Sequence, residues 1–133
     1  MGCGATTAAD AADGSAASPL VLWMGKTFVF VVTLTDKSTG RRVDLSLYQG
    51  RSQMRRSTAD NGVPVATLTV TTLNAPRGIA EVRLGATASR TGAQPPIAPG
   101  RYVLDVEFER INDPDDVLFG GFFHVEVRGE VTQ

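Results

Sequence analysis

The feature that most constrains this chain is a strict alternation of apolar and polar side chains within short segments. In the clearest segment, residues 101–110, most of the intervening residues are charged and the apolar ones are Tyr102, Leu104, Val106 and Phe108. Successive side chains of a β-strand face opposite sides, so a period of two residues predicts a strand with one buried face. No segment shows a convincing three-to-four-residue apolar period of the kind that marks an amphipathic helix.

Comparable segments recur along the chain, separated by turn residues such as glycine, proline and asparagine. We expect strands over 27–35, 41–45, 51–56, 65–73, 79–84, 101–110, 117–119 and 122–128. We expect turns or loops over 36–40, 57–64, 74–78 and 112–116, and a long connection over 86–100 with one short helical turn near 87–91. About seven or eight short strands at near-regular spacing predict an all-β domain, an antiparallel β-sandwich of the Ig-like or jelly-roll-like kind.

The chain divides into two parts. Residues 1–18 consist almost entirely of Ala, Gly, Thr, Ser and Asp, so they offer almost no large side chain for burial. Because burial of apolar surface must offset the entropy cost of ordering, we expect an extended or flexible N-terminal arm. In isolation this arm should be disordered, and neighbouring chains in an assembly could order it. Residues 19–133 form the predicted β-sandwich domain, with enough chain for one core.

Charge and hydropathy argue against two classes of partner. The formal net charge is −1, with 13 basic and 14 acidic residues, so no positive excess attracts nucleic acid or an anionic membrane. No stretch approaches the roughly 20 apolar residues that span a bilayer, and the N-terminus lacks the pattern of a secretory signal. The start, Met1–Thr6, formally matches a myristoylation pattern, but no polybasic segment follows it. We therefore expect no nucleic-acid partner and no membrane association.

Residues that could carry catalysis or bind a metal are scarce. The chain has one histidine, His124, and one cysteine, Cys3, whereas nucleophilic catalysis needs several cooperating groups and common zinc sites need three or four ligands. Asp113, Asp115 and Asp116 have the oxygen ligands that calcium prefers. However, they lack the spacing of a calcium-binding loop, and aspartate is common in turns for conformational reasons. We predict no catalytic residue, no metal and no cofactor.

Trp23 is a single large aromatic side chain at the start of the first expected strand. It is either a core residue or an interface anchor, because tryptophan is enriched in binding hot spots. Adding aromatic residues near the C-terminal strand and residues of the arm, the candidate interface residues are Trp23, Phe119, Phe122, Cys3, Thr6 and Thr7.

Several short motifs follow one another in a characteristic order. The segments that carry them are Trp23–Phe28, Val43–Tyr48, Gln53–Arg55, Gly78–Leu84, Pro99–Glu107 and Leu118–Val125. This series resembles the β-sandwich domain at the N-terminus of phage baseplate upper proteins and related small phage structural proteins. The resemblance covers about residues 23–132 and lies in the order of the motifs, since each motif alone is common strand-and-turn sequence.

The resemblance implies a virion structural protein, made in the cytoplasm of a bacterial host, that docks onto other virion proteins and forms a homo-oligomer in the assembly. It leaves two locations open, a tail or baseplate adaptor and a capsid cement protein that decorates the shell. A second hypothesis is a secreted Ig-like adhesin or a carbohydrate-binding module. That class predicts exposed aromatic side chains on one face or loop, whereas most aromatic residues here fall at inward strand positions.

Overall fold

The computed structural model describes residues 3–7, 14–56, 64–90, 92–93 and 96–129. Most of this part of the chain is β-strand. The strands are β1 (Cys3–Thr7), β2 (Leu20–Trp23), β3 (Phe28–Asp36), β4 (Tyr48–Arg55), β5 (Ala66–Asn74), β6 (Ile79–Leu84), β7 (Gly100–Arg110) and β8 (Asp113–Arg128). The described residues also contain two short helices, the 3-10 helix η1 (Ala75–Arg77) and the one-turn α1 (Ala86–Ser89). Neither helix has the length and apolarity that crossing a membrane would require.

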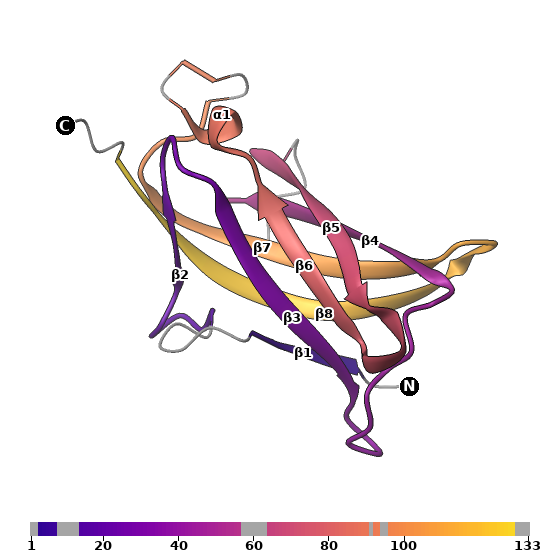
Figure 1. The fold of residues 1–133 in the computed structure, drawn as a ribbon. Coiled ribbons are helices and arrows are strands. Elements are labelled where there is room, and N and C mark those ends of the chain that lie inside the picture. The colour runs from indigo at the N-terminus through magenta and orange to yellow at the C-terminus, as the bar shows by residue number, and fades with distance from the viewer. Residues whose placement is uncertain (1–2, 8–13, 57–63, 91, 94–95, 130–133) are drawn as a thin grey trace.

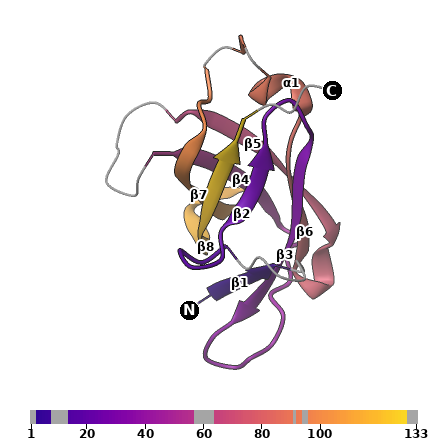
Figure 2. The ribbon, with the colours of Figure 1, turned by 90° about the vertical axis from the view of Figure 1, so that its left-hand side faces the viewer.

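The strands form one sheet that folds over itself into two layers (Figures 1 and 2). The strand order is β1-β3-β6-β5-β4-β7-β8-β2. β5 belongs to both layers, because residues 66–68 pair with β4 and residues from Thr69 onward pair with β6. The protein is therefore an all-β sandwich, which confirms the predicted fold class.

One strand pair departs from the predicted antiparallel arrangement. β2 runs parallel to β8, with Leu20 opposite Val125 and Trp23 opposite Arg128, while the remaining strand pairs among the described residues are antiparallel. Parallel strands need a long connection between them. β2 and β8 have one, because β8 follows all the other strands in the sequence. The sheet is thus mixed.

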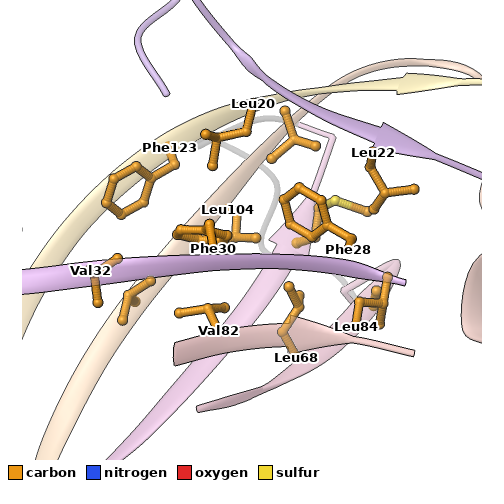
Figure 3. Packing of buried hydrophobic residues seen from close by; sticks show 14 of the residues in the cluster. Leu20, Leu22, Phe28, Phe30, Val32, Leu68, Val82, Leu84, Leu104 and Phe123 are labelled. Atoms are coloured by element: carbon orange, nitrogen blue, oxygen red, sulfur yellow. The ribbon is translucent and has the colours of Figure 1, made fainter. Parts of the chain in front are cut away.

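The core lies between the two layers (Figure 3). The alternating side chains of β7 all point into it, as the sequence predicts: Tyr102, Leu104, Val106 and Phe108 are buried. From the other layer, the ring of Phe30 lies 5.5 Å from the ring of Phe28 and 5.5 Å from that of Phe123 on β8. These contacts join β3 to β8 across the sandwich.

The sequence patterns did not predict β1 or β2. β1 consists of small residues without apolar alternation, and its backbone pairs with β3 from Cys3 opposite Asp36 to Thr7 opposite Val32. Further along the predicted arm, the Gly14 carbonyl accepts a hydrogen bond from the His124 main-chain N–H at 2.6 Å. Residues 8–13 of the arm and residues 57–63 of the predicted loop lie outside the described residues.

The prediction of a strand over 41–45 is wrong. The main-chain N–H of Val43 donates to Leu34 of β3, but that of Leu45 donates to Ala75 of η1. Because the segment changes partner after two residues, it forms only an isolated bridge, between Thr35 and Arg42.

The prediction of a turn over 112–116 is also wrong. Arg110 of β7 pairs directly with Asp113, so the chain reverses within Ile111 and Asn112 and the aspartates begin β8. Two-residue connections are common between antiparallel strands. A chain reversal is present near the aspartates, but it lies at Ile111 and Asn112, just before them.

Candidate docking face

The outward surface of the β4–β7–β8–β2 layer carries three of the predicted interface side chains. Antiparallel pairing places β4, β7 and β8 side by side, and β2 follows at the edge of the layer. We call this surface the docking face and define it by the outward side chains Arg51, Gln53, Asp105, Glu107, Val117, Phe119, Phe122 and Trp23.

Phe119 and Phe122 share this face because β8 contains a β-bulge between them. In a regular strand, residues three apart face opposite sides. Gly121 pairs with Val106 of β7, and the register then skips Gly120. The φ angle of Gly121 is 122°, a conformation that favours glycine. The extra residue restores both aromatic rings to the outside.

The two rings form an exposed aromatic pair. Their centroids lie 4.9 Å apart in an edge-to-face arrangement with an interplanar angle of 66°. Phe119 is 43% exposed and Phe122 is 52% exposed, and Val117 precedes them in the same outward row. Contiguous exposed apolar side chains are costly in water and mark interaction sites. This row is therefore the part of the face best suited to binding.

A polar strip borders the aromatic pair. Glu107 and Asp105 of β7 lie opposite the two rings across the ladder. Arg51 and Gln53 of β4 lie opposite those two carboxylates in turn. The four polar side chains line a shallow hollow of about 240 Å³.

The charges of this strip are largely paired with one another. The Arg51 guanidinium lies 3.0 Å from the Glu107 carboxylate and 3.8 Å from that of Glu109. Burial raises the pKa of Asp105, although its Oδ1 accepts a hydrogen bond from the Gln53 main-chain N–H at 3.2 Å, which lowers that pKa in part. The docking face thus combines the apolar row on β8 with a strip of polar side chains held by ion pairs and hydrogen bonds.

Trp23 lies outside the core at the end of the docking face. Its side chain is 42% exposed, and the Arg128 guanidinium lies 5.2 Å from the centre of its ring. Arg128 is six residues beyond Phe122 on β8, which corresponds to a separation of roughly 20 Å along the strand. The tryptophan and the aromatic pair therefore occupy the same face but separate regions of it.

The arm residues among the candidates lie elsewhere in the strand order. Cys3, Thr6 and Thr7 belong to β1, whose backbone pairs with β3 in the other layer. β1 also lies close to β8, the strand that carries Phe119 and Phe122.

His124 lies half-buried on the outward side of β8, two residues after Phe122. Among the residues that the structure describes, no three His, Cys, Asp or Glu side chains converge as a metal site would require, and this includes Asp113, Asp115 and Asp116. The sequence reasoning missed the polar strip. The alternation of β4 placed Arg51 and Gln53 on one face, but nothing local indicated that β4 pairs with β7.

No family model matches this sequence, and no curated protein matches it. The comparison with solved structures gives matches at low sequence identity. The filamin domain of Lin-41 matches with a TM-score of 0.45 and 17% identity, over 93% of this chain and 91% of that domain.

Two further structures match at the same level. The Siglec domain of GspB has a TM-score of 0.44 and 14% identity, over 97% of this chain and 59% of that one. A structure described as the basis of T cell specificity and activation by the superantigen toxic shock syndrome toxin-1 has a TM-score of 0.45 and 10% identity, over 96% of this chain and all of that one (100%). None of the three is a phage baseplate protein.

Proposed function

We propose that this protein is a non-catalytic docking module of a phage virion, which binds another protein chain through its docking face. The observation that carries the docking part is the outward row of Val117, Phe119 and Phe122 on β8. A flat sheet surface with an exposed aromatic centre and a polar border has the composition of a protein interface. The virion part rests on the order of the sequence motifs.

The experiment uses virion particles assembled without this protein, to which labelled protein is added before sedimentation. Wild-type protein should co-sediment with the particles, and the double variant Phe119→Ser/Phe122→Ser should bind at least about tenfold more weakly, as expected for loss of hot-spot residues. Val29→Ser is the matched control, because Val29 is an exposed apolar residue on β3 in the other layer. It should bind like wild type.

Two results would contradict the proposal. Particles that do not take up the wild-type protein would exclude the virion role, and full binding by the double serine variant would exclude this face. Counting copies per particle against the major capsid protein then separates the two locations. A capsid cement protein binds at many equivalent sites, whereas a tail adaptor forms a small closed ring.

A second candidate function is binding of a carbohydrate, as in a secreted adhesin or carbohydrate-binding module. The observation that favours it is the position of the exposed aromatic pair beside the polar hollow of Arg51, Gln53, Asp105 and Glu107. Sugars present both apolar C–H surfaces and hydroxyl groups, and this combination offers partners for each. A glycan-array screen tests it directly, and a screen without a reproducible signal would eliminate it.

A further inference from the structure

Two carboxylates lie so close to the aromatic pair that any surface covering the rings must cover them as well. Asp105 is paired with Phe122 across the β7–β8 ladder, and Glu107 is paired with Phe119. The β-carbons of directly opposite residues lie about 4.5–5.5 Å apart. Both carboxylates also line the hollow of about 240 Å³ on the docking face. A partner that packs on the two rings therefore removes water from these carboxylates.

The two carboxylates differ in whether the chain itself supplies a cation. Glu107 has the Arg51 guanidinium at 3.0 Å. Asp105 is half-buried and takes part in none of the ion pairs among the described residues, where its donor is the Gln53 main-chain N–H at 3.2 Å. Burial raises the pKa of Asp105, and the charges of Arg55 and Arg51 lower it only in part. A partner on this face thus meets a carboxylate that the described residues leave without a cation in contact.

The strands around the aromatic pair carry excess negative charge even when the arginines of β4 are counted. Residues 105–119 hold six acidic residues and one arginine, and β4 adds two arginines. The formal charge of these two segments together is therefore −3, whereas the whole chain carries −1 and the rest of it +2. Opposite charges across an interface steer association and select among partners. The charge of this region favours a basic partner.

Burial of a carboxylate is costly unless a cation or several hydrogen-bond donors compensate it. We propose that the docking face binds a basic segment of another protein, which places an arginine or lysine side chain against Asp105 and apolar side chains on Phe119 and Phe122. The cation then lies beside two aromatic rings, which attract positive charge, and its aliphatic stem covers part of their surface. This inference rests on the proposed docking function and adds the chemistry of the partner.

The test uses three short synthetic peptides, in which leucine alternates with arginine, with glutamine or with glutamate. Each is titrated into the isotope-labelled full chain and followed by nuclear magnetic resonance. The arginine peptide should shift the signals of Asp105, Phe119 and Phe122 and bind about tenfold more tightly than the glutamine peptide, because only arginine supplies a cation. Its binding should weaken as salt rises. The glutamate peptide should bind more weakly than either.

Asp105→Asn keeps the size of the side chain and removes its charge. It should weaken binding of the arginine peptide by about tenfold and leave binding of the glutamine peptide unchanged. A misfolded variant would lose both, so this selective loss reports the charge itself. Glu81→Gln is the matched control, because it removes one carboxylate from β6 in the other layer. It should bind both peptides like wild type.

Three results would refute this inference: equal binding of the arginine and glutamine peptides, an arginine peptide that shifts signals only elsewhere, or full binding of that peptide by Asp105→Asn. The particle experiment of the proposed function separates the two ideas. Particles that take up wild-type protein but not Phe119→Ser/Phe122→Ser, together with no preference for arginine, would keep the docking function and remove the basic partner. A preference for arginine without uptake by particles would keep the basic partner and remove the virion role.

Discussion

Gly120 lies against the backbone of β7, and its missing side chain helps to create the docking face. A β-carbon at Gly120 would lie 2.9 Å from the Val106 carbonyl oxygen, which as a backbone atom cannot move aside easily. The next residue, Gly121, has a backbone conformation that other residues rarely adopt. The bulge, and with it the shared orientation of Phe119 and Phe122, therefore depends on two glycines in succession.

We expect Gly120→Ala to destabilise the protein by about 1–3 kcal/mol, because the new methyl group forces a shift of the β7–β8 ladder. Gly85→Ala is the matched control, since Gly85 has a φ of −68° and no atom within 4 Å of an added β-carbon. It should change the free energy of unfolding by less than about 0.5 kcal/mol. Urea unfolding measures both, and equal effects would show that the bulge tolerates a side chain.

The neighbouring residues Leu22 and Trp23 make a second comparison. Leu22 is fully buried, so Leu22→Ala should cost about 2–5 kcal/mol through lost burial and a cavity. Trp23 is 42% exposed, so Trp23→Ala loses only part of the burial of a core residue, together with the contact with Arg128, which is worth about 0.5–1 kcal/mol at an exposed site. Thermal or urea unfolding should therefore show a larger loss of stability for Leu22→Ala than for Trp23→Ala. The opposite ranking would place Trp23 in the core.

Asp105 predicts a dependence of stability on pH. Burial raises the pKa of this carboxyl above its ordinary value of 3.8, so the folded state holds the proton more tightly than the unfolded state does. The stabilising contribution of Asp105 is therefore present below that value and is lost as pH rises through the folded pKa. Asp105→Asn stays neutral, so its stability relative to wild type should increase from about pH 3 to about pH 7. Urea unfolding at both pH values gives the difference in stability between Asp105→Asn and wild type. A relative stability that decreases with pH would show that the pKa of Asp105 is lowered in the folded state, not raised.

At the scale of the elements, β1 is distinctive because it pairs through its backbone and has little side-chain bulk to contribute. An unpaired strand edge exposes N–H and C=O groups and invites aggregation. β1 occupies the edge of β3 from Val32 to Asp36. A strand of small residues can protect an edge even though its apolar burial contributes little.

Deleting residues 1–7 should speed amide hydrogen exchange in β3 over residues 32–36 and increase aggregation, because this edge becomes unprotected. Amides of β7 serve as the internal control, since both of its edges remain paired with β4 and β8. Hydrogen exchange measured by mass spectrometry should therefore become faster in β3 and stay unchanged in β7. Unchanged protection of β3 would mean that β1 does not stay paired in solution.

At the scale of the whole molecule, β5 links the two layers and both layers share one core. Neither layer can open without removing pairs from β5 and exposing the apolar surface of the other. We therefore expect a single cooperative unfolding transition, in which far-ultraviolet circular dichroism and the fluorescence of Trp23 change together in urea. Two separated transitions would show that the layers unfold independently.

Much of this fold was predictable from local sequence, and much of the candidate site was not. The strands β3, β5, β6 and β7 follow from the alternation of their own side chains, to within one or two residues. β2 has only four residues, too few to show a period. The polar strip beside the aromatic pair needs β4 next to β7, two strands about 50 residues apart in sequence, and no local pattern reports such a pairing.

The sequence by itself determined that the chain forms short strands with one buried face, because alternation is a property of neighbouring residues and of the geometry of an extended backbone. Only the tertiary structure decided that Phe119 and Phe122 point the same way and that β2 runs parallel to β8. These features arise from a bulge and from contacts between distant segments. Their free energy depends on neighbours that the local sequence does not specify.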